Sequence, residues 1–568
     1  MTISDTEIPP YEMDDVPDVR ALPFPRRMRL ICRMWASQQH ATPFVVIVMY
    51  WLKYLIFFTG GWIFVSSFST NYTGLTSIGD WAFTGIAFKK AIVWAMFYEV
   101  AGFGCSFGPM NARFKPPMGG FLHFLRPGTT KLSLFPGLPL LGGITRSYLD
   151  VLLYAGLLFF LLRAAIAPDI TPELLIPVCI VLPLLGIADK TIYLAARSEH
   201  YFVALICITA ASTGDVWISA CQILWCCIWF WAATSKLNHH FPTIIQVMMN
   251  CGPFFPTVLK KKLFAQYPDD LRPSKFAAFM AHFGTVTEYM IPVVLLSSES
   301  ALVTGGALFV MFGFHSFIAA NNPAGMPIEW NILMIYGGIF LFGFNPEVSV
   351  LAVGNVPLLA GFLVISLVAI PLYGNLVPSK VSFLLAMRYY AGNWAYNIWL
   401  FRGDSAKKLN KLVKAAATMR EQLEEVLDDE LAVDAVMMSM PAQRLVYLQG
   451  KVLFDAIPEA VDDIDNYEWM EGEVVAGLAL GWNFGDGHLN EMQLLNAIQE
   501  QCGFEEGELR VVMVESQPLF GRHMAWKAVD AVTGILAEGK TEIAPMRDKQ
   551  PWPTGAYAEA FARGSSHR

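Results

Sequence analysis

The sequence predicts a polytopic α-helical membrane protein with about ten membrane segments and a small C-terminal α+β soluble domain. Of the 568 residues, 55% are hydrophobic and only 15% are charged, proportions that soluble chains do not reach. The 41 Phe, 19 Tyr and 16 Trp residues need a core or lipid around them, which excludes a disordered or nucleic-acid-binding protein. Most of the acidic residues behind the net charge of -8 lie near the two ends of the chain.

Long apolar runs define a helical transmembrane domain at residues 43–375, because each run can cross about 30 Å of hydrocarbon. The apolar stretch 201–235 is too long for one ordinary helix. It forms either two short passes, a dip that leads into a full crossing, or one long tilted helix. The other expected segments are 44–68, 81–105, 147–167, 173–195, 275–297, 300–320, 328–344 and 350–374.

Clusters of Lys and Arg between these runs predict the orientation of the chain in the membrane. Four clusters, before residue 44, after 105, before 275 and after 374, should all face the cytoplasm. That requires an even number of crossings between neighbouring clusters, which holds if 201–235 contributes two. We therefore expect a multi-pass protein of the cytoplasmic (inner) membrane, with the N-terminus and the C-terminal domain both in the cytoplasm.

Two segments outside the apolar runs have distinct compositions. Residues 1–42 predict a disordered, basic N-terminal segment. A long Pro- and Gly-rich loop at 106–146 carries Phe and Leu throughout without a helical or strand period. A loop of this length is either functional, a cap over a cavity, or an ordered connector that lies on the lipid headgroups.

The chain from 376 to 430 predicts interfacial and amphipathic helices. Its first part, 381–401, is rich in Tyr and Trp, as interfacial anchors are. Apolar residues then recur every three or four positions, which predicts an amphipathic helix whose basic first half faces anionic lipid. These apolar positions are Leu409, Leu412, Val413, Ala416, Met419, Leu423, Val426 and Leu427.

Residues 441–560 have the pattern of a soluble α+β domain with enough apolar positions to fold when expressed alone. The expected elements are a strand at 473–482, a helix at 490–501 closed by Gly503, a strand at 509–516 and a hairpin that turns at 532–534.

Ionisable side chains inside the apolar runs are candidates for function, because they are costly there unless they are paired or hydrated. On one continuous helix Lys236 and His240 would lie one turn apart, close enough for a proton relay. The alternative is a snorkelling lysine beside two interfacial histidines, His239 and His240. The candidates in or beside the runs are Glu99, Asp150, Asp189, Lys190, Asp215, Lys236, His282, Glu288, His315 and Glu329.

Two further groups surround this lysine in the sequence. His282, Thr285 and Glu288 follow one another at three-residue steps, so neighbouring pairs can touch. They form either part of a site or polar contacts between helices. His315 begins a segment that ends in Glu329 and Trp330 around a Pro-Gly turn, which is either part of a site or simple capping.

Several chemistries are excluded by missing motifs. The nine cysteines have no metal-ligand spacing and no paired histidine boxes are present, so no metal site is expected. The chain has no GxGxxG or Walker loop, no GxSxG elbow and no HExxH motif. ATP-driven transport and zinc proteolysis by this chain are therefore not expected.

Three segments, WAATSKLNHHFPTIIQVM, HFGTVTEYMIPVVLL and FVMFGFHSFIAANNP, resemble the vitamin K-dependent carboxylase-like superfamily, also called the horizontally transferred transmembrane domain. The resemblance covers roughly residues 200–345. It implies that a lysine in a K-L-x-x-x-aromatic context is the base that deprotonates a reduced quinone, and Lys236, Leu237 and Phe241 match that context. The small acidic C-terminal domain departs from the carboxylases and offers no platform for a peptide substrate.

The whole chain also resembles an actinobacterial family of transmembrane proteins of unknown function. The resemblance is carried by FYEVAGFGCSFGPM, GGFLHFLRPGTTKL and RYYAGNWAYN. It implies no activity.

These observations lead to one hypothesis and one alternative. The hypothesis is a helical core that holds a quinone-like or lipid ligand, with Lys236 as a proton-abstracting base supported by His240, His282, Glu288 and His315. The alternative is a non-enzymatic component of the cell envelope that binds or transports lipid, or that scaffolds a protein partner through its C-terminal domain. The sequence leaves open whether the protein is an enzyme, and it identifies no cofactor-binding residues for a quinone.

Overall fold

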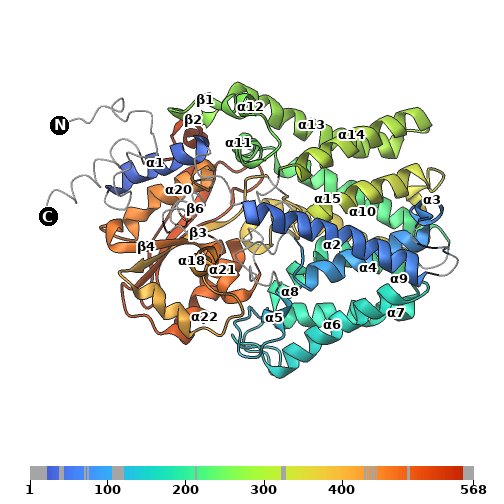
Figure 1. Ribbon diagram of the computed structural model, residues 1–568, viewed down its shortest axis with the longest axis horizontal. Helices are drawn as coiled ribbons and strands as arrows, with labels where there is room; N and C mark the ends of the chain where they lie inside the picture. The colour runs from blue at the N-terminus through green and yellow to red at the C-terminus, as the bar shows by residue number, and fades with distance from the viewer. Residues whose placement is uncertain are drawn as a thin grey trace.

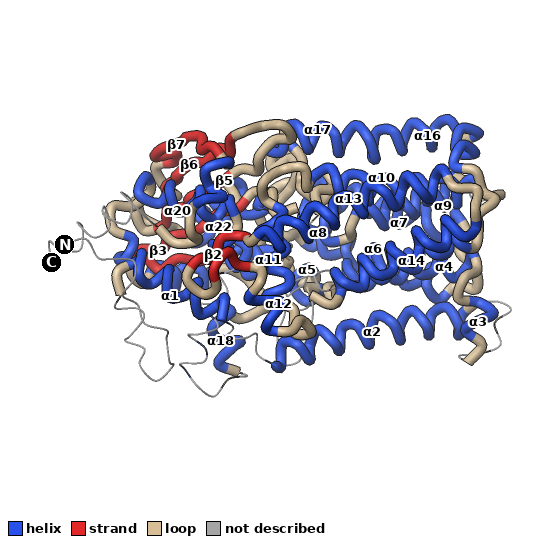
Figure 2. Tube along the Cα trace, turned by 90° about the horizontal axis from the view of Figure 1, so that it is seen from above, coloured by secondary structure: helices blue, strands red, loops and turns tan. Residues whose placement is uncertain are grey.

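The computed structural model describes residues 22–37, 44–69, 76–104, 120–211, 214–321, 328–389, 391–425, 444–482 and 487–553, and a few isolated positions between these ranges. A bundle of roughly parallel helices makes up one end of the molecule, and a sheet with its own helices makes up the other (Figure 1). Figure 2 shows the same two parts from above, with α16 and α17 along one side of the bundle and α2 along the other.

Six helices of the described residues are long and apolar enough to cross a membrane. Many of their large apolar side chains are exposed on the outside of the bundle, as lipid-facing side chains are. The six are α2 (Phe44–Phe68), α6 (Tyr148–Ile166), α10 (Val216–Ser235), α13 (Lys275–Ser297), α14 (Ala301–Ala319) and the run from α16 (Pro357–Val364) through a π turn to α17 (Ile370–Leu376).

Shorter helices fill the bundle between these six. They are α4 (Gly85–Val100), α7 (Pro172–Ala188), α9 (Val203–Ala210) and α15 (Ile328–Gly338), with the small helices α3 (Ile78–Trp81) and α8 (Lys190–Ala195) at its ends. Length and hydropathy therefore support six crossings among the described residues, and the expectation of about ten remains a prediction.

The ambiguous stretch 201–235 contains two helices. α9 ends at Ala210 and α10 begins at Val216, and Gly214 between them has a φ of +69°. A positive φ suits glycine and interrupts a right-handed helix. The alternative of one long tilted helix is therefore wrong.

The sheet at the other end has five antiparallel strands in the order β4-β3-β5-β6-β7. The predicted helix at 490–501, its closure by Gly503, the strand at 509–516 and the hairpin are confirmed. The strands are β3 (Tyr396–Arg402), β4 (Tyr467–Glu471), β5 (Leu509–Val514), β6 (His523–Asp530) and β7 (Gly534–Glu542), and the main helices of this part are α20 (Leu448–Ala456), α21 (Gly472–Leu480) and α22 (Met492–Cys502).

The predicted strand at 473–482 is wrong, because this segment is helix α21. A short apolar run that is buried on all sides has no period that separates a strand from a helix. Two glycines decide the matter locally: Gly481 ends the helix with a φ of +73°, and Gly472 begins it where a side chain would collide with Asn397.

The prediction for 376–430 is also wrong in two places. Tyr396–Arg402 forms β3, which lies between β4 and β5 with Trp399, Leu400 and Phe401 fully buried. Instead of one amphipathic helix the chain has a 3₁₀ turn at Ser405–Lys411 and a short helix α18 (Met419–Glu424).

The basic residues of that turn contact protein. Lys411 Nζ donates to the Cys502 carbonyl at 2.5 Å, and Lys408 Nζ donates to the Gly503 carbonyl at 3.2 Å. These carbonyls end α22, where positive charge is favourable. The C-terminus of α22 thus accounts for Lys408 and Lys411 of the basic half without lipid.

The N-terminal prediction is wrong for residues 24–37, whereas the rest of 1–42 lies almost entirely outside the described residues. This segment is helix α1 (Phe24–Ser37), which packs on the sheet-containing part. Phe24 meets Phe454 with ring centroids 5.7 Å apart, and Arg27 pairs with Asp465 at 2.8 Å. Segments from both ends of the chain therefore build one structure.

The Pro- and Gly-rich loop is described from residue 120 onward, where it contains α5 (Phe121–Phe124). It lies between the bundle and the sheet: Lys131 pairs with Asp150 of α6 at 2.7 Å, and Gln493 of α22 donates to the Ser133 carbonyl at 2.8 Å. The chain between α10 and α13 also lies at this junction, with α11 (Phe241–Cys251), α12 (Thr257–Lys261), β1 (Phe264–Gln266) and β2 (Asp270–Pro273).

A first prediction concerns the soluble part. The fragment 441–560 lacks β3, so β4 and β5 lose the strand that pairs with both of them. We expect this fragment to aggregate, and we expect a fragment that starts at residue 391 to be more soluble and more protected from hydrogen exchange. Cooperative unfolding of fragment 441–560 alone, followed by circular dichroism, would show that β3 is dispensable.

Candidate functional site

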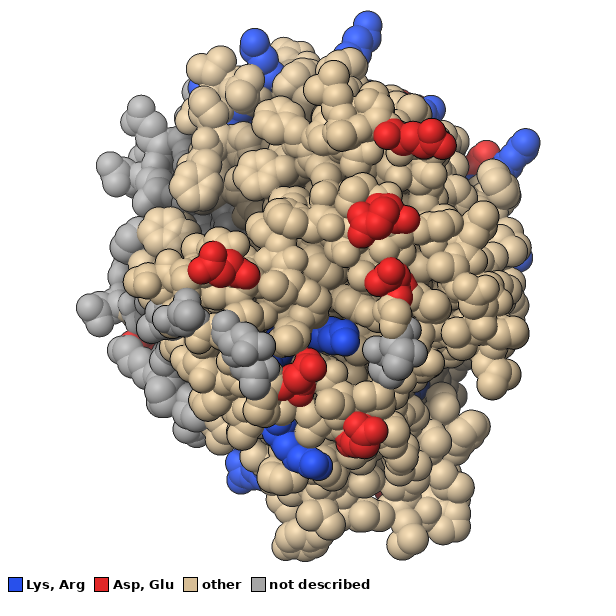
Figure 3. All heavy atoms as spheres, turned by 90° about the vertical axis from the view of Figure 1, so that its right-hand side faces the viewer, with Lys and Arg blue, Asp and Glu red and all other residues tan. Residues whose placement is uncertain are grey.

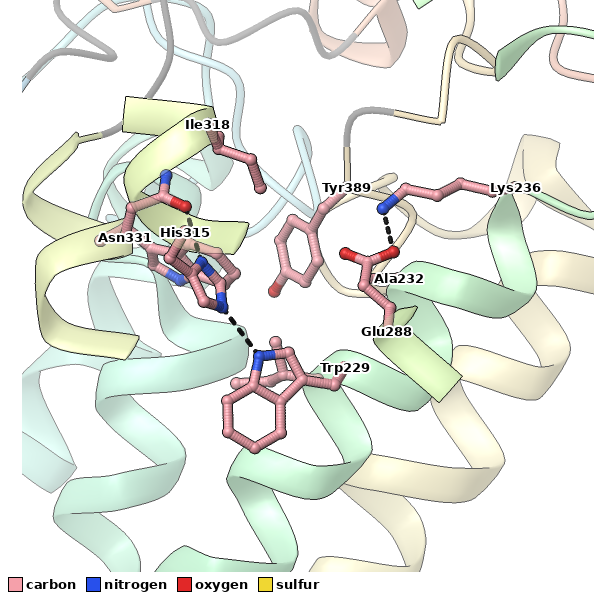
Figure 4. A pocket seen from close by; sticks show the side chains of 10 residues that line it. Trp229, Ala232, Lys236, Glu288, His315, Ile318, Asn331 and Tyr389 are labelled. Atoms are coloured by element: carbon pink, nitrogen blue, oxygen red, sulfur yellow. Dashed lines mark hydrogen bonds and ion pairs between the residues drawn. The ribbon is translucent and has the colours of Figure 1, made fainter. Parts of the chain in front are cut away.

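A small pocket lies where the bundle meets the sheet-containing part, at the C-terminal end of α10. Figure 4 shows Lys236 and Glu288 on one side of it, His315 and Asn331 on the other, and Tyr389 between them. Four helices and the segment after α17 contribute to it. The lining residues are Ile228, Trp229, Ala232, Lys236, Glu288, His315, Ile318, Trp330, Asn331 and Tyr389.

Lys236 and Glu288 form a direct ion pair inside the protein. Lys236 is the first residue after α10, Glu288 lies on the buried face of α13, and their side chains are only 4% and 5% exposed. The ammonium also lies 4.8 Å from the ring centroid of Phe241 and 5.9 Å from that of Phe314. The snorkelling alternative is therefore wrong, since this lysine points into the protein and toward a carboxylate.

His315 of α14 is held by two hydrogen bonds. The indole N–H of Trp229 donates to His315 Nε2 at 2.9 Å, and His315 Nδ1 lies 2.8 Å from Asn331 Oδ1. An indole only donates, so Nε2 must accept and the proton lies on Nδ1. His315 is thus a fixed, neutral wall of the pocket with both nitrogens engaged.

Tyr389 connects the pocket to a second buried ion pair. Its hydroxyl donates to Glu199 Oε1 at 3.0 Å, and Arg197 Nε donates to the same oxygen at 3.0 Å. The sequence analysis missed Arg197 and Glu199 and assigned Tyr389 to an interfacial anchor. The sequence did contain a signal for this pair. Arg197 and Glu199 lie between two apolar runs, and charged residues at membrane depth need partners.

The cavity is small. As the side chains stand, its free space holds about one water molecule. Any ligand larger than that requires the walls to move apart. Tyr389 is the lining residue that comes from the segment between α17 and β3, outside the four helices of the pocket.

Two of the five predicted catalytic residues lie elsewhere. His282 is on the exposed face of α13, because six residues turn a helix by about 240° and carry it away from Glu288. His240 is not on the same helix as Lys236, since α10 ends at Ser235 and α11 begins at Phe241. Its Nε2 instead lies 2.9 Å from Gln517 Oε1 in the sheet-containing part.

Most of the other ionisable candidates have structural partners. Asp150 caps α6 and pairs with Lys131, and Asp189 pairs with Arg146 rather than with Lys190. Glu99 and Glu329 are buried on either side of Gly104, where an added Cβ would meet both carboxylates. Asp215 is exposed at the start of α10. The structure thus brings only Lys236, Glu288 and His315 of the predicted set to one pocket.

A second prediction follows from the ion pair. Glu288→Leu leaves the Lys236 ammonium buried without its carboxylate, which should lower the free energy of unfolding by about 3–5 kcal/mol. The double variant Lys236→Met/Glu288→Leu should recover most of that loss, because it removes both charges. Thermal unfolding in detergent measures both, with His282→Leu on the exposed face as the control. A Glu288→Leu variant as stable as the native protein would contradict the pairing.

A third prediction concerns His240. Burial disfavours the imidazolium and lowers the pKa of His240 to about 4 from its ordinary value of 6.5. Between pH 6.5 and 4 the unfolded state therefore binds more protons than the folded state. The free energy of unfolding should fall as the pH drops from 6.5 toward 4. His240→Gln should flatten this dependence, whereas His523→Gln at an exposed position should not. Unfolding midpoints measured from pH 7.5 to 4.5 test it, and equal slopes for His240→Gln and the native protein would refute it.

Comparison with known proteins gives one match. No curated protein and no solved structure matches the chain. Residues 1–560 match the family described as transmembrane protein of unknown function (DUF3556). The match covers nearly the whole chain and agrees with the six apolar helices, so this protein is an integral membrane protein that belongs to the DUF3556 family.

Proposed function

We propose that the protein binds a quinol-like or lipid ligand with an ionisable hydroxyl in the junction pocket, and that Lys236 accepts the proton of that hydroxyl. The observation that carries the proposal is the buried Lys236–Glu288 pair beside a cavity with aromatic and polar walls. Buried ion pairs rarely improve stability over apolar residues of similar size, so a pair that faces a cavity suggests a role in binding or chemistry.

The proposed step consists of two proton transfers in sequence. The shared proton of the pair moves from the Lys236 ammonium to the Glu288 carboxylate, which leaves a neutral amine. The amine then takes the proton of the ligand hydroxyl: the ligand O–H bond breaks, an N–H bond forms, and the ligand oxyanion remains next to the new ammonium. Glu288 keeps the first proton until the oxyanion is protonated again.

The other lining residues position the ligand. His315 is held by Trp229 and Asn331, so it presents a fixed edge and keeps its proton. Phe241 and Phe314 flank the ammonium and keep water from it, which favours transfer of its proton to Glu288. Tyr389 closes the cavity and is the wall that we expect to move when a ligand enters.

The resemblance of residues 200–345 to the carboxylase-like membrane domain supports this assignment, since it implies a lysine base that acts on a reduced quinone. Lys236, Glu288 and His315 occur in the order of that resemblance and line one pocket. The proposal does not extend to protein carboxylation, because the C-terminal domain is small and acidic.

We also propose that the bundle crosses the cytoplasmic (inner) membrane about ten times and that both chain ends lie in the cytoplasm. The packing of α1 on the sheet-containing part supports this proposal, because two parts in contact lie on one side of the membrane and are then separated by an even number of crossings. Charged side chains are thinly scattered over the opposite end of the bundle (Figure 3), whereas Lys260, Lys261 and Lys262 of the α12 region lie at the sheet-facing end.

The alternative function is a non-enzymatic envelope component that binds or passes lipid, or that recruits a protein partner through its soluble domain. The small cavity favours the protein-partner form of this alternative, because only about one water fits there as the side chains stand. The two functions differ in what the protein carries and in whether the lysine must lose a proton.

A fourth prediction separates them. Mass spectrometry of extracted lipids should find a quinone with the purified protein, and a bound naphthoquinol should give the spectrum of its anion near neutral pH. Lys236→Ala and Lys236→Arg should both lose that anion, since a guanidinium does not accept a proton. His282→Ala is the matched control. Full formation of the anion in Lys236→Arg would show that Lys236 is not the base. An envelope lipid in place of a quinone would favour the alternative function.

A further inference from the structure

Three potential metal-ligand residues from separate elements meet in the sheet-containing part. His488 lies in a 3₁₀ turn at Gly487–Asn490, Glu491 is the residue before α22, and Glu515 directly follows β5. One donor atom of each lies within 4.8 Å of the others. No metal site was expected from the cysteine and histidine spacings. Glu515 is 24 residues beyond Glu491, so only the fold brings these residues together.

The spacing of the His488 and Glu515 donor atoms suits one ion. His488 Nε2 lies 3.1 and 3.0 Å from the two carboxylate oxygens of Glu515. Two ligands at about 2.1 Å from a metal and about 90–110° apart are themselves separated by about 3.0–3.4 Å. An ion can therefore replace the proton between imidazole and carboxylate without a large rearrangement.

Two of the three proposed ligands can be reached from water. The side chains of His488 and Glu515 are 18% and 19% exposed, so an ion can reach them from water. The Arg388 charge also acts on Glu515 and would compete with the ion.

The cluster lies near the junction with the membrane domain. Gln493, two residues after Glu491, donates to the Ser133 carbonyl of the loop between α4 and α6. Gln517, two residues after Glu515, contacts His240 at the start of α11. An ion held by this cluster would link the two chain segments that contact the membrane domain.

We propose that His488, Glu491 and Glu515 form a binding site for one divalent transition-metal ion, such as Zn²⁺ or Mn²⁺. One imidazole and two carboxylates are the ligand types of such ions. Three protein ligands leave at least one coordination position for water or another ligand.

Calorimetric titration of the full-length protein in detergent, first treated with a chelator, tests the site with ZnCl₂ and MnCl₂. We expect one site per chain for at least one of the two ions and a higher unfolding temperature when it is bound. Glu515→Gln and His488→Gln should each weaken binding by at least about tenfold. His488→Gln loses the nitrogen that would bind the metal but keeps an N–H that can donate to Glu515. A loss of metal binding in this variant is therefore not explained by a loss of the folded structure.

The control is His523→Gln, which removes an exposed histidine of β6 outside the cluster. It should bind the ion as the native protein does. The proposal fails if the native protein binds neither ion, or if His488→Gln, folded by its own unfolding curve, binds as tightly as the native protein.

Discussion

The Lys236–Glu288 ion pair is the interaction on which the rest of the candidate site depends. Moving either charge out of water costs several kcal/mol, and each partner offsets part of that cost for the other. The pair exists because α10 ends one residue before Lys236 and because the buried positions of α13, which recur every three or four residues, include Glu288. Phe241 and Phe314 then keep water away, and the segment with Tyr389 completes the enclosure.

This enclosure ties the membrane domain to the soluble one. Tyr389 lies between the last membrane helix and β3, so the same segment closes the pocket and leads into an interior strand of the sheet. His240 and Gln517 add a hydrogen bond across the junction a few residues from Lys236. The segment that carries Tyr389 therefore connects the soluble domain directly to the pocket, and Tyr389 is the side chain that we expect a ligand to displace.

The sequence predicted what depends on local pattern and missed what depends on tertiary contacts. The length of the apolar runs identified the membrane domain. Gly503 identified the end of α22, and the turn residues of the hairpin identified β6 and β7. β3 and α21 were misassigned because burial on all sides erases the period of a short segment. For the site, the rarity of charges at membrane depth pointed to Lys236, Glu288 and His315. It could not show that His282 turns outward, that His240 faces the soluble domain, or that Tyr389 lines the pocket, since helix ends and helix rotation are set by packing.

The central claim is that Lys236 is sealed inside the protein by its carboxylate partner and the junction. Amine-reactive labelling of the native protein in detergent, followed by peptide mass spectrometry, tests it most directly, with exposed Lys262 as the internal reference. We expect Lys262 to be modified rapidly while Lys236 stays protected until the protein is unfolded. Modification of Lys236 at the rate of Lys262 in the folded protein would show that the lysine faces water, and the account of the site would be wrong.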